Sequence, residues 1–183
     1  YLDNRSHSWL NYFDESTGFV RGKSSTGEWR EDFNPFNASR IANEYCEGNA
    51  WQYTWLVPQD LDLLVERFGG VESTLERLDG LFTAASKMEG EDVTPDISGL
   101  IGQYVHGNEP SHHIIYFYTM LGEPWKAADR LYEVMATMYS TEPDGLSGNE
   151  DVGQMSAWYV MTTLGFYPVE PASGKYVLGV PMV

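Results

Sequence analysis

The sequence is poor in cysteine, in basic residues and in long apolar runs, and each shortage excludes a class of protein. Cys46 is its single cysteine, which rules out a disulfide within the chain and leaves the redox compartment open. No apolar stretch approaches the roughly 20 residues that a membrane-spanning helix needs. Only 11 lysine and arginine residues stand against 27 acidic ones, for a net charge of −16, so nucleic-acid binding is disfavoured.

The sequence does contain enough apolar and aromatic residues for a packed core. Of its 183 residues, 42% are hydrophobic and 14% are aromatic, which argues against disorder and suffices for one domain. The acidity is compatible with a divalent cation or a neutral substrate such as a sugar, and it is also what solubility alone would produce. Both ends, YLDNRSHSW and KYVLGVPMV, read as cut inside an element. We therefore expect a fragment of a longer protein, in which an export signal could lie upstream.

The order of helices and loops predicts an all-α protein. Apolar spacing, prolines at helix starts and glycines at helix ends predict helices. The pattern predicts the end of a helix at 1–12. It predicts further helices at 44–56, 58–68 and 71–87, and at about 111–121, 124–139 and 151–164. Long loops are expected at 14–40, where Phe19, Trp29, Phe33 and Phe36 suggest packing, and at 90–108, and strand composition marks the tail at 175–183. Paired helices with functional loops at one end suit an arc of an α/α toroid, although the pattern alone does not exclude a bundle.

Three stretches place carboxylates, amides and aromatic rings beside a helix boundary. They are EYCEGNAWQYTW (44–55), HGNEPSHH (106–113) and SGNEDVGQMSAWY (147–159). In the first, Glu47 lies among several aromatic residues, and burial there would raise its pKa as a general acid requires. The alternative is an exposed glutamate in the first turn of a helix.

The second stretch offers hard oxygen ligands and two adjacent histidines. Asn108 and Glu109 carry the oxygens that calcium prefers. His112 and His113 would point about 100° apart on a helix, so they cannot hold one zinc ion as an i, i+4 pair would. One of them is then expected to be a core histidine, and the other could bond a hydroxyl of a ligand.

The third stretch leaves two interpretations open. Glu150 and Asp151 stand where a helix begins, and acidic residues there ordinarily cap the helix and complement its dipole. The amide of Gln154 and the indole of Trp158 follow within two turns, which capping alone does not require. Two carboxylates on different elements, with aromatic platforms and amides, suit the hydrolysis of a glycosidic bond.

Read together, these stretches resemble glycoside hydrolase family 92, the calcium-dependent exo-acting α-mannosidases. The matching motifs are EGNAWQYTW with VPQD after it, PDISGLIGQYVHGNEPSHH (95–113) and GNEDVGQMSAWYVMTTLGFYPV (148–169), and the resemblance runs from GFVRGK (18–23) to YVLGVP. It implies that residues 1–183 form the later part of an (α/α)₆ catalytic domain. An N-terminal β-sandwich and earlier helices would be absent from this chain and would pack against it.

The resemblance also implies a mechanism with inversion at the sugar carbon. Glu47 matches the general acid and Asp151 the general base. Some members carry a second acid two positions before the base, where this chain has Asn149. Asn108 and Glu109 fall in the segment that is associated with calcium in the family. Other sugar contacts are assigned by position near the motifs to Trp51, His112, His113, Asn149 and Gln154.

The implied substrate is a mannose-containing glycan, and family habit suggests export from a bacterial cell. The sequence does not give the linkage that is cleaved, for which the positions around His106 and Gly107 are candidates. Three alternatives remain: a mannose-binding toroid without catalysis, a fragment that is inert alone, and a lyase or another hydrolase on a similar toroid.

Overall fold

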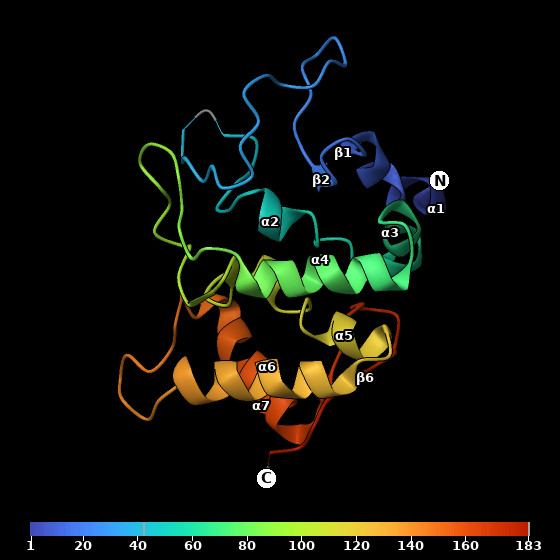
Figure 1. The fold of residues 1–183 in the computed structure, drawn as a ribbon. Coiled ribbons are helices and arrows are strands. Elements are labelled where there is room, and N and C mark those ends of the chain that lie inside the picture. The colour runs from blue at the N-terminus through green and yellow to red at the C-terminus, as the bar shows by residue number, and fades with distance from the viewer. Residues whose placement is uncertain (42, 183) are drawn as a thin grey trace. The chain divides into compact units, whose positions relative to one another are not determined.

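The regular structure of the chain is mostly helical, and the chain divides into two compact units. The structure, a computed structural model, describes residues 1–41 and 43–182 (Figure 1). Unit 1 comprises Tyr1–Pro95 and Gly102–Tyr104, and unit 2 comprises Asp96–Ile101 and the residues from Val105 on. The predicted helical class is confirmed, whereas the toroid, of which this would be an arc, and the missing N-terminal domain stay predictions.

Helices supply most of the regular structure, and the strands are only two residues long. The α-helices are α1 (Leu2–Ser6), α2 (Ala50–Tyr53), α3 (Leu61–Arg67), α4 (Val71–Thr83), α5 (Tyr116–Met120), α6 (Pro124–Thr137) and α7 (Gln154–Leu164). The 3₁₀ segments are η1 (Ser8–Asn11), η2 (Glu109–Ser111) and η3 (Asp151–Gly153). The strands are β1 (Phe13–Asp14), β2 (Phe19–Val20), β3 (Leu100–Ile101), β4 (Tyr104–Val105), β5 (Phe166–Tyr167) and β6 (Val177–Leu178).

Two antiparallel strand pairs lie within single units. β1 pairs with β2 in unit 1, and β5 pairs with β6 in unit 2. The strand composition of the tail is thereby confirmed at β6, while Val183 lies outside the described residues.

In unit 1, α3 and α4 pack against each other (Figure 1). Apolar residues recur at helical spacing, so each helix has one face to bury. The buried side chains are Leu61 and Leu64 in α3 and Thr74, Leu78, Leu81 and Phe82 in α4. Gly69 and Gly70 separate the two helices with φ of 89° and 111°, a backbone that suits glycine and confirms the predicted stop.

The loop at 14–40 packs through its aromatic rings, as expected. Phe19 lies 5.9 Å from Phe33 and 5.2 Å from Trp51, measured between ring centroids. Phe36 lies 5.7 Å from Trp51, and Lys23 stacks over Trp29. The loop is therefore ordered by packing, although it has little regular structure.

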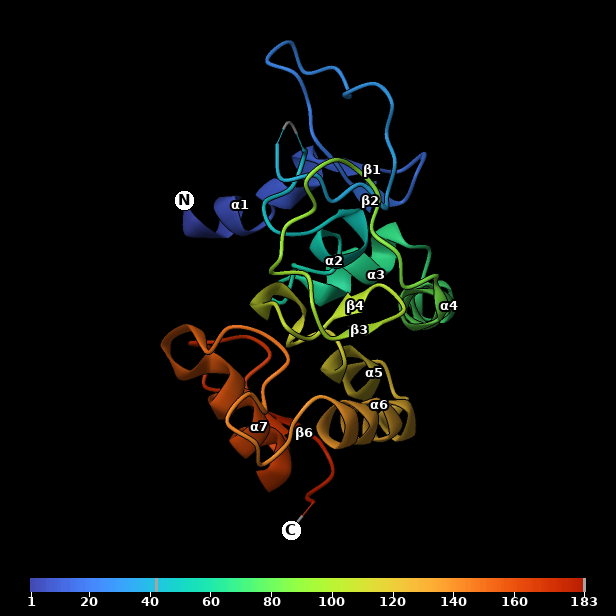
Figure 2. The same cartoon turned by 90° about the vertical axis from the view of Figure 1, so that its left-hand side faces the viewer.

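In unit 2, the chain at the start of α5 is deeply buried. The five residues Ile114–Tyr118 are all at most 1% exposed, and α5 packs against α6 (Figure 2). Pro124 opens α6, as predicted, since its missing N–H would be unpaired at that position anyway. α7 carries apolar residues on several sides, and it buries Met155 and Trp158 while Val160 and Leu164 are exposed.

The predicted helix at 44–56 was wrong in extent, because α2 has only four residues. Glu47 has a left-handed backbone with φ of 53°, and Asn49 is extended, so the helix cannot begin before Ala50. Asn49 and Gln52 then form a capping box around the first turn. The motif is therefore a turn followed by one turn of helix.

Two other predicted helices begin later than expected. At 111–121 the backbone first makes i to i+3 bonds, with Ile114 N donating to Ser111 O at 3.0 Å, and α5 begins only at Tyr116. At 151–164 the first three residues form η3, in which Val152 has φ of 54°, and α7 begins at Gln154. Asp151 thus precedes the α-helix instead of opening it.

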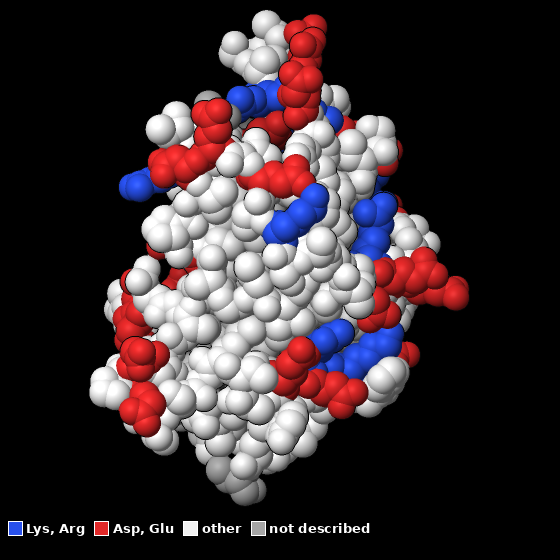
Figure 3. Space-filling view, turned by 60° about the vertical axis from the view of Figure 1, so that its left-hand side comes forward, with Lys and Arg blue, Asp and Glu red and all other residues white. Residues whose placement is uncertain are grey.

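Acidic side chains form several separate groups on the face shown in Figure 3, with fewer basic ones among them. Within 1–41 and 43–182, no helix has the length and apolar character needed to cross a bilayer.

Candidate functional site

Glu47 lies at the tip of a tight turn in unit 1. Its side chain is exposed, so the burial among aromatic rings that sequence reasoning considered is not present in this structure. Nearby, Tyr53 Oη donates to the backbone oxygen of Cys46, and Asn43 Nδ2 donates to that of Gly48 at 3.1 Å. Burial, then the charges of Cys46 and Glu47, raise the pKa of Tyr53 to about 12. The turn is held on both sides of Glu47.

A buried network of amides supports this turn from below. Asn49 Nδ2 donates to Gln103 Oε1 at 2.9 Å, and Gln52 Nε2 donates to Gln103 O at 2.6 Å. Gln103 Nε2 donates in turn to the carbonyls of Ala85 and Lys87. Asn49 and Gln103 are both fully buried. Buried amides with satisfied partners rigidify a site, so they fix the backbone next to Glu47.

Trp51 packs inside unit 1. Its ring contacts Phe19 and Phe36, and together with Phe19 it borders an apolar cavity of 200 Å³ that Thr54 and Arg77 also line. Its Nε1 is buried and finds no hydrogen-bond acceptor among the described residues. The assignment of Trp51 as a sugar contact stays a prediction.

Three loops of unit 2 meet in backbone contact. His106 N donates to Gly99 O at 2.9 Å, and Gly107 N donates to Ser98 O at 3.0 Å. Ser98 Oγ donates to the carbonyl of Ser147. The structure thereby brings together the second and third stretches, and it adds the segment at 96–99, which the motif of 95–113 contains.

Gly107 lies where these loops are closest, and its position has no room for a side chain. A Cβ at 107 would lie against Ser98 Oγ and 2.5 Å from the carbonyl oxygen of Ser147. Real Cβ atoms do not approach backbone this closely, so the loops would have to separate.

We therefore expect Gly107→Ala to destabilise the protein by about 1–3 kcal/mol, as overpacking does. Thermal unfolding measures the change. Gly80→Ala is the matched control, because Gly80 lies within α4 and a Cβ there meets nothing within 4 Å. The control should unfold at the same or a higher temperature. Equal unfolding temperatures for Gly107→Ala and the unchanged protein would contradict the close contact.

Asn108 and Glu109 lie just beyond this contact, at the start of η2. Asn108 is 5% exposed. Oε1 of Glu109 is buried and has no hydrogen-bond partner among the described residues, and the same holds for Ser111 Oγ. A buried carboxylate oxygen without a partner is costly, and a hard cation would satisfy it. These oxygens fit a calcium ion in kind. No group of three His, Cys, Asp or Glu side chains in 1–41 and 43–182 could hold a metal, so carbonyl or amide oxygens would have to complete the set.

His112 has the structural role that sequence reasoning left open for one histidine. It is 2% exposed; its Nε2 lies 2.9 Å from His106 O, and its Nδ1 lies 3.2 Å from Gln154 Nε2. Burial lowers the pKa of His112 to about 4 and that of His106 to about 2, so both are neutral at ordinary pH. His113 is also buried and packs edge-on against Phe117.

The sequence left open whether Glu150 and Asp151 cap a helix or serve a site, and the two residues differ in this respect. Glu150 accepts hydrogen bonds from Ser156 N at 3.1 Å and from Ser156 Oγ, which caps α7. The side-chain and then the backbone bond from Ser156 hold the pKa of the Glu150 carboxyl below its usual value. Asp151 is exposed, and none of the described residues bonds its carboxylate. Glu150 therefore caps α7, and the carboxylate of Asp151 is left without a structural role in capping.

The other two predicted contacts of this stretch bond to protein groups. Asn149 Nδ2 donates to Asp96 Oδ1 at 3.1 Å, and Asn149 is exposed. Gln154 Nε2 also lies 3.2 Å from Tyr167 Oη. Their assignment to the sugar stays a prediction.

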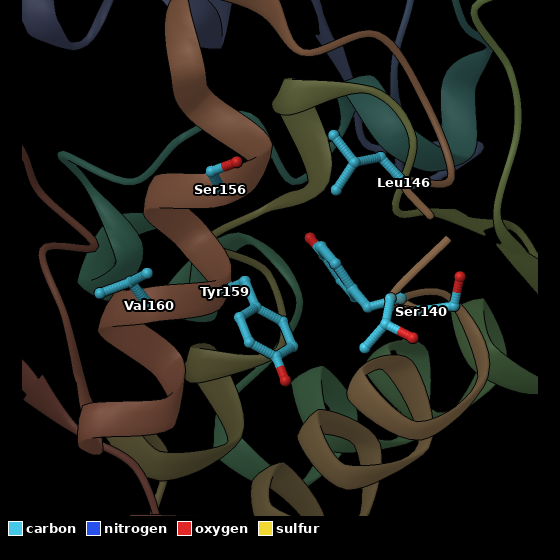
Figure 4. Close-up of a pocket in the computed structure, with 7 residues that line it drawn as sticks. Ser140, Leu146, Ser156, Tyr159 and Val160 are labelled. Carbon is cyan, nitrogen blue, oxygen red and sulfur yellow. The ribbon is translucent and has the colours of Figure 1, made fainter. Parts of the chain in front are cut away.

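A hollow of 430 Å³ opens beside the capped end of α7 (Figure 4). Ser156 and Tyr159 border it from α7, while Ser140 and Leu146 border it from the loop before α7. Because Ser156 also bonds Glu150, the hollow lies next to the turn that carries Asp151.

The family model described as the glycosyl hydrolase family 92 catalytic domain matches residues 1–183. The chain belongs to glycosyl hydrolase family 92. The resemblance read from the three motifs is thereby confirmed.

Solved family 92 structures resemble this chain closely. The GH92 α-mannosidase from Bacteroides thetaiotaomicron in complex with mannoimidazole is 42% identical, with a TM-score of 0.86, over 97% of this chain and 24% of that one. The GH92 inverting mannosidase of the same organism is 34% identical, with a TM-score of 0.78, over 98% of this chain and 25% of that one.

A curated relative, described as an uncharacterized secreted glycosidase from Arthroderma benhamiae, is 26% identical over 97% of this chain and 23% of its own length. The family 92 chain therefore spans about a quarter of the length of the relatives it matches.

Sequence reasoning missed several residues that build the site of this family 92 chain. Nothing in the residues next to Gln103 and Tyr139 indicates their role, because both act through hydrogen bonds to residues far along the chain. Tyr139 Oη lies 2.6 Å from His106 Nε2, and the ring of Trp158 lies 4.2 Å from that of His106. The density of aromatic residues near the motifs was the available signal.

Proposed function

We propose that this chain is part of an enzyme that removes terminal α-linked mannose from glycans with inversion of configuration. The observation that carries the proposal is the 42% identity to a family 92 α-mannosidase along 97% of the chain. A second solved relative is described as an inverting mannosidase, and it is 34% identical.

In the proposed reaction, water attacks the anomeric carbon of the terminal mannose while the glycosidic bond breaks. Glu47 gives its proton to the departing glycosidic oxygen, and Asp151 takes a proton from the attacking water. The products are mannose of inverted configuration and the shortened glycan. Two carboxyl groups on opposite sides of the sugar are the minimum that this chemistry needs.

The local geometry of both carboxylates supports these roles. Glu47 itself is left-handed, and Asp151 is followed by the left-handed Val152. A β-branched residue with positive φ is strained, and strain of this kind is concentrated at functional sites. Asp151 is exposed and its carboxylate bonds none of the described residues, as a base that binds water requires. Glu47 is exposed too, so we propose that its acid role depends on enclosure by substrate and further protein.

We propose that Asn108 and Glu109 contribute oxygen ligands to a calcium ion. The support is the buried, unpartnered Oε1 of Glu109 together with the buried Asn108. When bound, calcium would act as a Lewis acid on sugar hydroxyls. The part of this chain is to hold both side chains in place through the backbone contacts of 98–99 with 106–107.

Removal of calcium should abolish mannose release, and added calcium should restore it. The expected loss is about 100-fold or more, since Lewis-acid assistance is worth several kcal/mol. The measurement is mannose release by the full-length protein after exhaustive chelation, with magnesium as the control cation. Activity that survives complete chelation would remove the metal from the mechanism.

The proposed function is tested by incubating the full-length protein with mannobioses of each linkage and analysing the anomer that is released. We expect cleavage of at least one linkage with release of the inverted anomer. Binding of mannose without cleavage would instead support a mannose-binding toroid. The chain of 183 residues alone is expected to be inactive, because it covers about a quarter of its relatives. Export is proposed from the curated relative, which is described as secreted.

A further inference from the structure

We propose that His112 is a positioning residue that fixes the turn carrying Asn108 and Glu109 relative to the turn carrying Asp151. The inference rests on the proposed function, and all of its residues belong to unit 2. His112 bonds both turns at once, one through each ring nitrogen.

The hydrogen bonds of His112 define its tautomer. Nε2 faces the carbonyl oxygen of His106 at 2.9 Å, so it must donate and carry the proton. Nδ1 is then the acceptor, and it faces the amide nitrogen of Gln154 at 3.2 Å. A neutral imidazole has one donor and one acceptor, and both are used here. The ring is therefore fully committed to protein groups, which leaves none of its nitrogens for a sugar hydroxyl.

The Nε2 bond closes the segment from His106 to His112, in which Asn108 and Glu109 lie. The two imidazole rings stack at 4.9 Å, and Tyr139 Oη holds the ring of His106 through a bond of 2.6 Å to its Nε2. Loss of this bond would open the closure between the His112 side chain and His106, while the backbone bonds of 106–107 to 98–99 and the bond from Trp158 Nε1 to His112 O would remain.

The Nδ1 bond anchors the start of α7. Gln154 is the first residue of α7 and the third after Asp151, and the residues between them form η3. Trp158 Nε1 donates to His112 O at 3.0 Å, one turn further along the same helix. Through Gln154, the exposed turn with Asp151 is thus tied to the buried side chain of His112.

Positioning of this kind has measurable consequences. A displacement of about 1 Å can lower a catalytic rate about 100-fold, and loss of a residue that orients a metal ligand typically costs 10–100-fold in metal affinity. His112 should therefore influence both calcium affinity and turnover without touching either the ion or the sugar.

Two substitutions separate the two nitrogens in the full-length protein. In His112→Gln the amide nitrogen can replace Nε2 as the donor to His106, while the acceptor at Nδ1 is lost. In His112→Asn the amide oxygen can replace Nδ1 as the acceptor from Gln154, while the donor at Nε2 is lost. The readouts are kcat, KM and the calcium dissociation constant from calorimetric titration.

We expect His112→Gln to lower kcat about 30-fold with a calcium dissociation constant within about threefold of the unchanged protein. We expect His112→Asn to weaken calcium about tenfold and to lower kcat less than His112→Gln does when calcium is saturating. Gln154→Leu should lower kcat at least as much as His112→Gln, since it also removes the bond to Tyr167 Oη. The double variant of His112→Gln with Gln154→Leu should be no worse than Gln154→Leu alone, because both remove the bond between the two side chains. His7→Gln, at a histidine whose side chain is 51% exposed in unit 1, is the control and should leave both readouts unchanged.

Several results would overturn the inference. They are multiplied effects in the double variant, which would give Gln154 a separate contact with the sugar, and equal losses of kcat and calcium affinity in both His112 variants. If the His112 variants do not fold, Gln154→Leu decides alone, and unchanged kcat in it would reject the role. Failure of the proposed function is distinguishable, because then the unchanged protein itself releases no mannose.

Discussion

Glu47→Gln is expected to lower the release of mannose from natural glycans by about 1,000-fold, within the range of about 10²–10⁴ that general acid catalysis contributes. The departing sugar oxygen is a poor leaving group without a proton, and glutamine cannot supply one. An aryl mannoside with a low-pKa phenol leaves unaided, so its hydrolysis should fall by no more than about tenfold. The measurement is kcat/KM on both substrates.

The unequal loss is the informative part of this result. A variant that only disturbed folding or sugar binding would lose both activities alike, which would argue against the acid role. Glu66→Gln makes the same change at an exposed glutamate of α3 and serves as the control. It should retain both activities.

Asp151→Asn is expected to stop turnover while it leaves binding of mannose intact. Without the base, the attacking water keeps its proton, and kcat should fall by about 10³–10⁴-fold. Asparagine has nearly the same size, and the carboxylate of Asp151 bonds none of the described residues, so the turn itself should persist. Calorimetric titration with mannose at a stated calcium concentration measures the binding.

The neighbouring carboxylate, Glu150, provides the best control for Asp151→Asn. Glu150→Gln changes a carboxylate one residue away that caps α7 through Ser156, and its amide oxygen can still accept one of those bonds. It should lower kcat far less than Asp151→Asn does, and Asp129→Asn on α6 should have no effect. Retained turnover in Asp151→Asn would move the base to another residue.

Elements with strong local signals could be predicted from the sequence. α3, α4 and α6 have apolar residues at helical spacing, the pair Gly69–Gly70 separates α3 from α4, and Pro124 opens α6. Because these signals act within a few residues, no distant contact was needed to read them.

The prediction of a helix at 44–56 was wrong because contacts with distant residues outweighed the local preference for a helix. Its residues are typical of a buried helix, but Glu47 is left-handed, and the amides of Asn49, Gln52 and Gln103 hold the chain in a turn. A positive φ at a glutamate has no sequence signal, and the partner Gln103 is far along the chain. The turn could therefore only be found in three dimensions.

The residues of the candidate site were predicted from the family resemblance of the three motifs, and only in part from the physical chemistry of the residues. The stretches at 106–113 and 147–159 do meet in unit 2, yet nothing local showed that 98–99 would join them. The fate of His112 was open in the sequence, since spacing could not tell which histidine would be satisfied in the core. Which of Glu150 and Asp151 caps α7 was likewise decided by Ser156, whose hydroxyl gave no local hint.

The close contacts at Gly107 constrain how the protein could be re-engineered. A larger residue at 107 would meet the side chain of Ser98 and the backbone carbonyl oxygen of Ser147, so it requires the removal of that side chain together with a shift of the backbone at 147. Random single substitutions would rarely satisfy that requirement. Libraries aimed at new glycan preferences should vary positions 98 and 107 jointly with the length of the loop that carries Ser147, and keep the surrounding histidines constant.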